Sequence, residues 1–348
     1  MFVDCLFGSG LSRPLSAELC LLLRDLADRH AFRIAVDLPS GISSDDGHIL
    51  NERLPDYHLT LALGAWKYAH WRMPACASMG ERRLVPIGVA PVLEAAELIQ
   101  RPRLSPPEPD AHKYTRGLCA VVAGEMPGAT LLACKAATHG GAGYVKLQAD
   151  SLPDGAPIDL VVDAAALDDD RLDAVLVGPG LGRSDLSRNR LEAALSSGRS
   201  LVLDADALHL LAPHMLRPDV EVIATPHEGE LAKLCKSFAV VAQGKTAQAC
   251  ALARASGMVI IAKGPDTIIA APDGRLVMSP SPTSWLSVAG TGDVLAGIVV
   301  SRVASGQDPF EAACEAVWLH AEAARRCSAP FTASELAGKV AAAYAACL

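Results

Sequence analysis

The chain has 348 residues, of which 51% are hydrophobic and 20% charged, enough apolar material for about two cores at roughly 100 to 200 residues per domain. This composition excludes a disordered chain, and the length excludes a small disulfide scaffold. Lys and Arg number 31 against 39 Asp and Glu, a net charge of −8, so the chain has no overall field that would attract nucleic acid or an anionic membrane.

The cysteines and the apolar segments indicate the cellular compartment of the protein. Ten cysteines are scattered through apolar segments without a C-x-x-C pair, and we interpret them as reduced, buried thiols. No apolar run approaches the roughly 20 residues that a membrane span needs, and no basic segment precedes the first apolar residues as in a signal peptide. The sequence therefore predicts a cytoplasmic protein that has no membrane or nucleic-acid partner.

Residues 1–100 predict a Rossmann-like α/β domain that begins in its middle, because the first apolar segment has nothing before it to pair with or cover it. Ser16 is the predicted N-cap of a helix that has leucines at helical spacing. Strands are predicted at residues 1–7, 32–36, 58–63 and 83–89. The first two run into Gly8-Ser-Gly10 and Asp37-Leu-Pro-Ser-Gly41, and ligands of open α/β sheets bind at such strand ends.

Residues 101–111 are predicted to be an extended linker, since residues 101–110 hold four prolines and no periodic apolar pattern. In residues 112–348 strand and helix patterns alternate, which predicts a mainly parallel sheet with helices on both faces. Strands are predicted at 118–123, 144–147, 159–162, 174–177, 201–203, 221–224, 258–262, 267–271 and 276–279. Helices are predicted through Ala137, from Ser184, Glu228, about Val241, about Gly292 and Pro309.

The strongest local signal for chemistry is Gly290-Thr-Gly-Asp293 ahead of an apolar helix. The glycines let the backbone approach a ligand, and the unpaired amides of the first helical turn suit a phosphate. Asp293 could then accept a proton from a hydroxyl that attacks this phosphate. An Asp that simply caps the helix explains the five residues 289–293 equally well.

Other predicted strands of this domain also end in polar or glycine residues. Lys263 follows one strand and His227 another, while Gly178-Pro-Gly-Leu-Gly182 and Leu203-Asp-Ala-Asp206 follow two more. Taken singly, Lys263 could be a solvated strand end and His227 a local hydrogen-bonding residue. Five such ends on one edge of a parallel sheet predict a site.

In this order the motifs resemble the ADP-dependent NAD(P)H-hydrate dehydratases of the ribokinase-like superfamily, over about residues 111–330. The motifs are His112-Lys with Gly117, Gly140-Gly-Ala-Gly-Tyr-Val145, Gly178–Gly182, Leu203–Asp206, Thr225-Pro-His-Glu-Gly-Glu230, Ala262-Lys-Gly264 and Gly290–Asp293. Val3–Leu11 and Val36–Gly41 are similar to the second half of the NAD(P)H-hydrate epimerase domain. The bifunctional NAD(P)H-hydrate repair enzymes carry these two domains in this order.

The resemblance implies repair of hydrated NADH and NADPH by a lyase that an isomerase domain accompanies. ADP, or ATP in some relatives, would phosphorylate the ring hydroxyl of the S hydrate with Mg²⁺ present. Loss of phosphate would then give NADH or NADPH, with AMP as the other product. A ribokinase-like small-molecule kinase shares the same turn and remains the alternative, and a non-catalytic nucleotide-binding remnant is a third reading.

The resemblance also assigns roles to residues. Asp293 would be the catalytic base. Nucleotide binding would fall to Lys263, Gly264, Pro265, Asp266, Thr267 and Gly292. Substrate binding would fall to Ala142, Gly182, His227 and Asp293, and in the first domain to Gly8–Pro14 and Asp37. Asp4 and Ser40 match potassium-site positions. We also expect a homo-oligomer.

The epimerase family's Asn/Gly-rich phosphate-binding stretch would lie before Asp4, so we expect either an incomplete sequence or a truncated gene product, and no epimerase activity from residues 1–100. We also expect Val3, Leu6, Ile34 and Val36 to be poorly protected on one side of the sheet.

Overall fold

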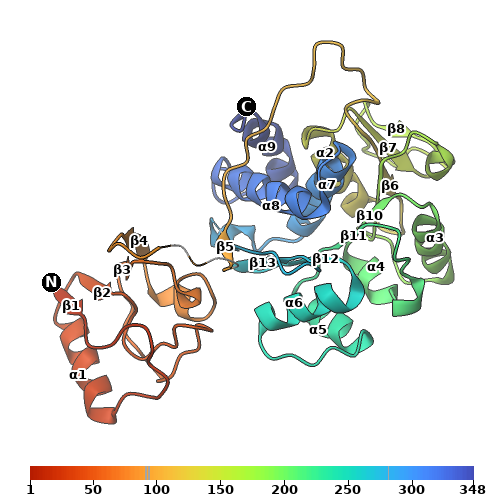
Figure 1. Cartoon of the computed structure of the whole chain (residues 1–348). Coiled ribbons are helices and arrows are strands. Elements are labelled where there is room, and N and C mark those ends of the chain that lie inside the picture. The colour runs from red at the N-terminus through yellow and green to blue at the C-terminus, as the bar shows by residue number, and fades with distance from the viewer. Residues whose placement is uncertain (91, 93–94, 281) are drawn as a thin grey trace. The chain divides into compact units, whose positions relative to one another are not determined.

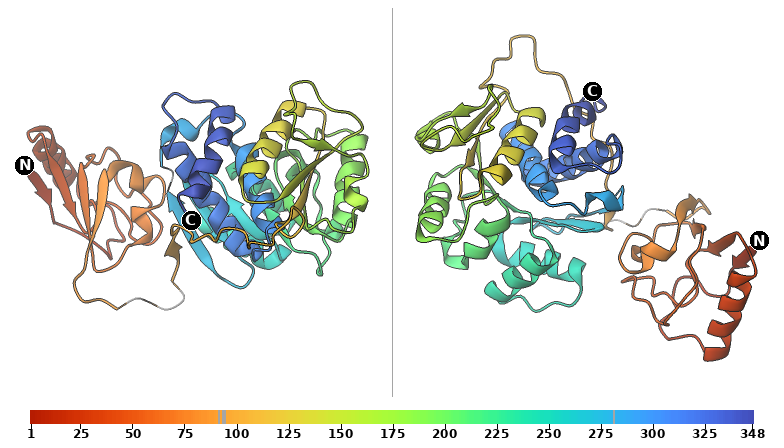
Figure 2. Two further views of the ribbon diagram at one scale, coloured as in Figure 1. Left: turned by 90° about the horizontal axis from the view of Figure 1, so that it is seen from above. Right: turned by 180° about the vertical axis from the view of Figure 1, so that it is seen from behind.

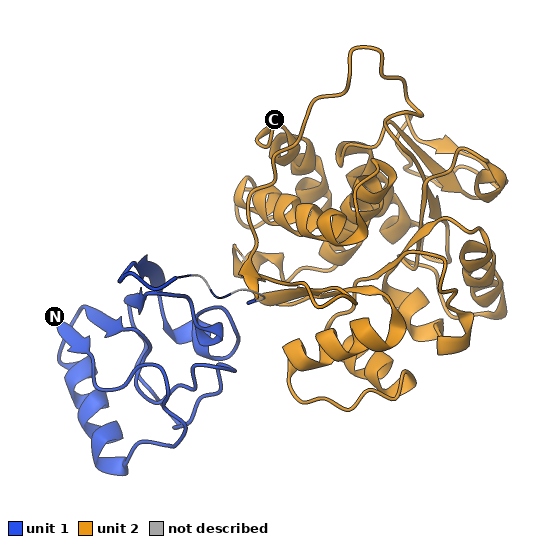
Figure 3. Cartoon of the chain, in the orientation of Figure 1, with its two compact units in different colours: residues 1–95 blue, residues 96–348 orange. Residues whose placement is uncertain are grey.

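The computed structural model describes residues 1–90, 92, 95–280 and 282–348. Contacts divide the chain into two compact units, Met1–Ala95 and Ala96–Leu348 (Figure 3). In the described residues no helix is long and apolar enough to cross a membrane.

Unit 1 is a parallel sheet in the order β1-β2-β3-β4 with one long helix packed on it. The elements are β1 (Phe2–Asp4), α1 (Ala17–Asp28), β2 (Arg33–Val36), β3 (Leu59–Leu63) and β4 (Glu81–Val85), with 3₁₀ turns at Tyr68–His70 and Ala75–Ser78. Ser16 caps α1 as predicted, because its side chain accepts a hydrogen bond from the Leu19 amide. The helix buries Cys20, Leu23 and Ala27 against Phe2 and Ala35.

The opposite face of this sheet is partly exposed among the described residues. Val3 pairs with Ile34, and Ile34 with Leu59, so these side chains form a row across the strands. Val3 and Leu6 are 40% and 51% exposed, while Ile34, Val36 and Leu59 are half-buried. The prediction of a poorly protected apolar face is confirmed.

Unit 2 is a sheet in the order β5-β14-β13-β12-β11-β10-β9-β6-β7-β8 (Figure 1). Its central strands from β12 to β8 are parallel, and β13 pairs antiparallel with both β12 and β14. The strands are β5 (Glu97–Leu98), β6 (Leu118–Val122), β7 (Tyr144–Gln148), β8 (Val161–Val162), β9 (Ala174–Val177), β10 (Ser200–Leu203), β11 (Val222–Ala224), β12 (Val259–Ala262), β13 (Asp266–Ala270) and β14 (Leu276–Pro280). The predicted α/β class with a mainly parallel sheet is confirmed.

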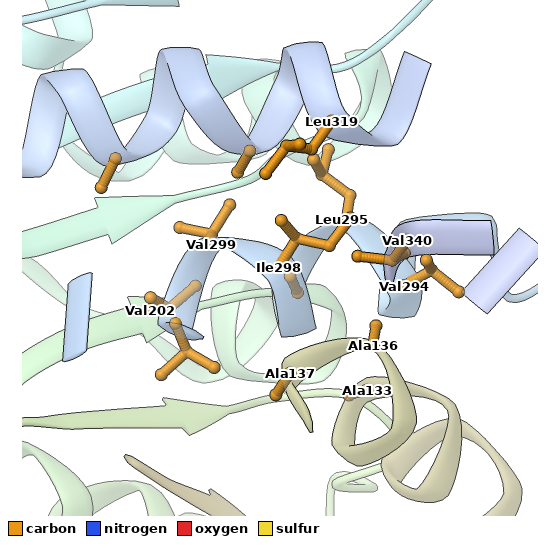
Figure 4. Packing of buried hydrophobic residues seen from close by; sticks show 14 of the residues in the cluster. Ala133, Ala136, Ala137, Val202, Val294, Leu295, Ile298, Val299, Leu319 and Val340 are labelled. Carbon is orange, nitrogen blue, oxygen red and sulfur yellow. The ribbon is translucent and has the colours of Figure 1, made fainter. Parts of the chain in front are cut away.

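Helices cover both faces of the sheet (Figures 1 and 2). On one face lie α2 (Pro127–His139), α7 (Thr291–Ala304), α8 (Pro309–Arg325) and α9 (Ala333–Ala345). On the other lie α3 (Asp185–Ser196), α4 (Ala205–Leu210), α5 (Glu228–Ser237) and α6 (Lys245–Ser256). The central α7 is mostly apolar, and it packs between the sheet, α2, α8 and α9 (Figure 4).

One strand and two α-helices described in unit 2 were not predicted: β5, α4 and α9. Helix α9 has a sequence signal, since Thr332 and Glu335 form a capping box at its start. The two-residue β5 pairs with β14, so the division between the units falls at Ala95 and Ala96 instead of at residue 100. The chain then stays on unit 2, where Leu104 is buried and its amide donates to the Cys347 carbonyl (3.0 Å).

Candidate active site

The predicted polar strand ends of unit 2 meet at one edge of its sheet. Val177, Leu203 and Ala224 are the last residues of β9, β10 and β11 and lie in register, with Ile260 of β12 next in the row. Because these strands are parallel, the segments that follow them emerge together, and α7 begins beside them. The sheet order therefore assembles the site that the sequence predicted from five separate motifs.

The centre of this edge is an ion pair on Asp204. Its carboxylate is 1% exposed, and its Oδ1 accepts hydrogen bonds from Lys263 Nζ (2.7 Å) and Thr225 Oγ1 (2.6 Å). These three residues come from the ends of β10, β12 and β11. The Lys263 side chain is 19% exposed, so its ammonium is held at the mouth of the site and not in bulk solvent.

The first turn of α7 faces this ammonium. A Cβ placed on Gly292 would lie 3.3 Å from Lys263 Nζ. Gly290 is the N-cap, in the left-handed conformation (φ 91°), and Asp293 is the third residue of the helix. Asp293 makes no capping hydrogen bond within the described part of the chain, so its interpretation as the helix cap is wrong. The carboxylate is left available beside the unpaired amides of the helix start.

The surroundings of Asp293 favour its protonated form more than water does. Burial and the nearby negative charge of Asp204 raise the pKa of Asp293 to about 7, although the Lys263 ammonium acts in the opposite direction. A carboxylate with a pKa near neutrality is a stronger proton acceptor than an ordinary aspartate, and about half of it is ionised at neutral pH.

The Gly178–Gly182 loop folds tightly over the same edge. The Gly182 amide donates to Asp206 Oδ2 (3.1 Å), which ties this loop to the turn after β10. The start of α2, which the sequence analysis missed, also joins the loop, because the Thr130 hydroxyl donates to the Pro179 carbonyl (3.0 Å). The signal that could have found it is Pro127 at the first helical position after a buried strand.

Gly178→Ala is expected to destabilise unit 2 by about 3 kcal/mol through backbone strain and overpacking. Gly178 has φ 132°, and an added Cβ would lie 1.8 Å from the Asp204 carbonyl oxygen. Gly198→Ala is the matched control, because Gly198 also has a left-handed φ of 69° but nothing within 4 Å of the added Cβ. Urea denaturation of the two variants measures the difference, and equal losses of stability would contradict this account.

His227 is bonded locally at the start of α5. Its Nδ1 accepts from the amides of Gly229 (3.0 Å) and Glu230 (3.4 Å), and the His227 amide donates to the Glu230 carboxylate (2.8 Å). Its side chain remains 60% exposed with Nε2 3.3 Å from Glu230 Oε1. His227 is therefore the helix cap, and its exposed ring edge can still meet a ligand.

The segment after β12 is held by a residue that the sequence analysis missed. Lys245 Nζ, at the start of α6, donates to Asp266 Oδ1 (2.7 Å) and to the Asp266 carbonyl (2.8 Å). Thr267 Oγ1 donates to the Gly264 carbonyl (2.9 Å), which closes the turn. The predicted nucleotide-binding residues from Lys263 to Thr267 thus form the turn after β12 and the start of β13, beside Gly292.

The structure does not bring Ala142 to this group. Ala142 precedes the amino end of β7, is buried, and donates its amide to Ser301 Oγ (2.9 Å) in the second half of α7. The amino ends of parallel strands lie at the edge opposite to Asp204 and Lys263. We therefore leave Ala142 out of the proposed site.

In unit 1, Asp4 and Ser40 are brought together but do not fit a potassium ion. The Asp4 carboxylate is 1% exposed and accepts hydrogen bonds from the Leu6 amide, the Ser40 amide and hydroxyl, and the Tyr57 hydroxyl. Four donors satisfy a carboxylate, which leaves no oxygen for a cation. We derive no step through potassium.

Asp37, which directly follows β2, is another carboxylate of unit 1 that accepts several hydrogen bonds. Lys67 donates to its Oδ1, as does the Leu63 amide (3.2 Å), and the Ser9 amide donates to Oδ2 (2.9 Å). Burial alone would raise the pKa of Asp37, but these donors outweigh it and lower the pKa. Lys67 lies in the loop after β3 and was not predicted as a site residue.

The comparisons with known proteins agree with this geometry. Residues 119–344 match the family model described as NAD(P)H-hydrate dehydratase. The chain belongs to the NAD(P)H-hydrate dehydratase family. Residues 1–69 match a second model, described as the YjeF-related protein N-terminus.

Individual members of the family match along most of the chain. The bifunctional NAD(P)H-hydrate repair enzyme Nnr of Salinibacter ruber is 32% identical over 94% of this chain and 67% of its own length. The ADP-dependent (S)-NAD(P)H-hydrate dehydratase of Neisseria meningitidis is 37% identical over 67% of this chain and 85% of its own. A Bacillus subtilis ADP/ATP-dependent NAD(P)H-hydrate dehydratase, co-crystallised with ATP/Mg²⁺, superposes with a TM-score of 0.62 at 26% identity, covering 73% of this chain and 99% of that one. The similarity to the Nnr enzyme thus extends over both regions of this chain, the N-terminal region and the dehydratase region that follows it.

Proposed function

We propose that unit 2 dehydrates the S hydrates of NADH and NADPH with ADP as the phosphoryl donor. The observation that carries the proposal is Asp293, which lies in the first turn of α7, close to Lys263, and has no hydrogen-bond partner among the described residues, in a chain of the dehydratase family. A proton acceptor next to an anion-binding helix start is what phosphorylation of a hydroxyl requires.

The proposed nucleotide site is the segment Lys263–Thr267 together with the amides of Gly292 and its neighbours. Lys263 and the helix start would carry the charge of the phosphates. No group of three or more His, Cys, Asp or Glu side chains in the described residues could hold a metal ion. The carboxylates near the proposed phosphate site are those of Asp204 and Asp293. They fit a Mg²⁺ that takes most of its ligands from phosphates and water, and such an ion would neutralise phosphoryl charge.

In the proposed reaction Asp293 accepts the proton of the ring hydroxyl, and the oxygen of that hydroxyl attacks the β-phosphorus of ADP. The bond from that phosphorus to the bridging oxygen breaks, and AMP leaves with the electron pair. The phosphorylated ring then loses phosphate and a proton from the adjacent carbon, which forms the C=C bond of the dihydropyridine. Hydroxide is a poor leaving group, and this sequence replaces it with phosphate.

The deciding experiment incubates the 348-residue chain with NADH S hydrate, Mg²⁺ and either ADP or ATP. We expect regeneration of dihydropyridine absorbance and one AMP with one phosphate per ADP consumed. A stable phosphorylated alcohol without dihydropyridine would instead establish a ribokinase-like kinase. The ADP or ATP preference is read from the same assay, while the cytoplasmic location and the homo-oligomer stay predictions of the sequence.

We expect turnover to rise with pH through about 7. A base must be ionised to accept a proton, and the pKa of Asp293 is raised to about 7, so its active fraction falls about tenfold per unit below that pH. Initial rates at saturating substrate between pH 5 and 9 measure the profile. A profile that is flat between pH 5.5 and 8 would contradict the role of Asp293.

We expect the chain not to epimerise the R hydrate. In unit 1 the carboxylates of Asp4 and Asp37 are satisfied by donors, and the lowered pKa of Asp37 makes it a weak base. NMR of the R hydrate mixed with the chain checks this, and measurable conversion to the S form would refute it. The dehydratase activity of residues 106–348 expressed alone is compared with that of the 348-residue chain.

A further inference from the structure

The turn Gly290-Thr-Gly-Asp293 has glycine on both sides of Thr291, and glycine has more backbone freedom than any other residue. Such a turn lets the backbone approach a phosphate but does not by itself keep the amides and Asp293 in one position. Catalysis of phosphoryl transfer depends on that position, because its main components are orientation and preorganised charge. Whatever holds Thr291 therefore controls the catalytic turn.

Thr291 is held from two directions. Its hydroxyl lies 3.0 Å from the carbonyl oxygens of Leu286 and Val288, in the segment that leads into α7. Its own carbonyl oxygen lies 2.9 Å from Nε2 of His320, on α8. The neighbouring Leu319 is fully buried and packs in the core beside Leu295 of α7 (Figure 4). The second attachment thus comes from a long, well-packed helix.

The hydrogen bond fixes the chemical state of the His320 ring. A carbonyl oxygen only accepts, so Nε2 must carry the hydrogen. Burial and the Lys263 charge lower the pKa of His320 to about 4, although the bond to Thr291 acts in the opposite direction. The ring is therefore a neutral donor near pH 7.

We infer that His320 is a positioning residue of the dehydratase site, which fixes the Gly290–Asp293 turn through its hydrogen bond to the Thr291 carbonyl. The inference rests on the proposed function. His320 acts through Thr291 and has no contact with the reacting atoms in this account. It ties α8 to the residues that hold the phosphoryl group.

The test compares His320→Leu, which removes the donor, with His320→Gln, whose amide can replace the Nε2 hydrogen. His139→Leu is the matched control, since His139 also has a ring nitrogen (Nδ1) 2.9 Å from a carbonyl, that of Lys135, but lies at the far end of α2. Each variant is assayed for kcat and for the KM of ADP. Hydrogen exchange of the amides of residues 290–294 is measured by mass spectrometry.

We expect His320→Leu to lower kcat by on the order of 100-fold, the scale of a slight misplacement of reacting groups, with the KM of ADP within a few-fold. Exchange at residues 290–294 should quicken several-fold, and His320→Gln should recover most of both. Wild-type kcat and exchange in His320→Leu would overturn the inference. Equal losses in both variants, with faster exchange throughout α7 and α8, would also overturn it. If the wild-type chain does not turn over the hydrate, the proposed function fails, while the exchange comparison still decides whether His320 fixes the turn.

Discussion

Asp293→Asn is expected to lower turnover of the S hydrate by at least about 100-fold, the scale of a lost general base. The amide has nearly the same shape, cannot accept the hydroxyl proton, and leaves the amides of the α7 start in place. Nucleotide affinity should therefore change by no more than a few-fold. Rates of dihydropyridine formation and calorimetric titration with ADP measure the two quantities separately.

Folding should not suffer from Asp293→Asn, because Gly290 and not Asp293 caps α7. Burial and the charge of Asp204 raise the pKa of Asp293, so its ionised form opposes folding at neutral pH. We expect an unchanged or slightly higher melting temperature at pH 8. Normal turnover by this variant would mean that another group accepts the proton.

Lys263→Met is expected to lower turnover by about 100- to 1,000-fold, the cost of removing one preorganised group that faces developing charge. The substitution also leaves the Asp204 carboxylate buried with the Thr225 hydroxyl as its remaining side-chain donor among the described residues. An unsatisfied buried group costs about 1 to 3 kcal/mol, and we expect a loss of stability in that range. Turnover and urea denaturation are measured on the same preparation.

Asp204→Asn and the double variant Asp204→Asn/Lys263→Met separate the two effects. Replacing the carboxylate removes the uncompensated charge, so the double variant should regain stability relative to Lys263→Met but not activity. The pH profile gives an independent check. Loss of the Asp204 charge lowers the pKa of Asp293, and loss of the Lys263 charge raises it, so the two single variants should shift the profile in opposite directions. Shifts in the same direction would contradict the assigned charges.

Most elements and the polar strand ends of unit 2 were predictable because their signals are local. Buried parallel strands appear as short apolar runs, the N-caps Ser16 and Ser184 precede their helices, and Gly290-Thr-Gly-Asp293 is a helix start. Motif order and resemblance then indicated the family. Helix α9 was missed although its capping box is equally local.

By itself the sequence determined the α/β class, the strand ends that carry chemistry and the family of the chain, since each depends on residues close together in the chain. Only the tertiary structure decided which of those residues meet. Asp204 and Lys263 are 59 positions apart, and Lys67 pairs with Asp37 30 positions away. Their pairing depends on the order of the strands in the sheet, as does the placement of Ala142 at the opposite edge. The pKa of Asp293 follows from the same order, because burial and the charges of Asp204 and Lys263 exist at that carboxylate only after the strands have paired.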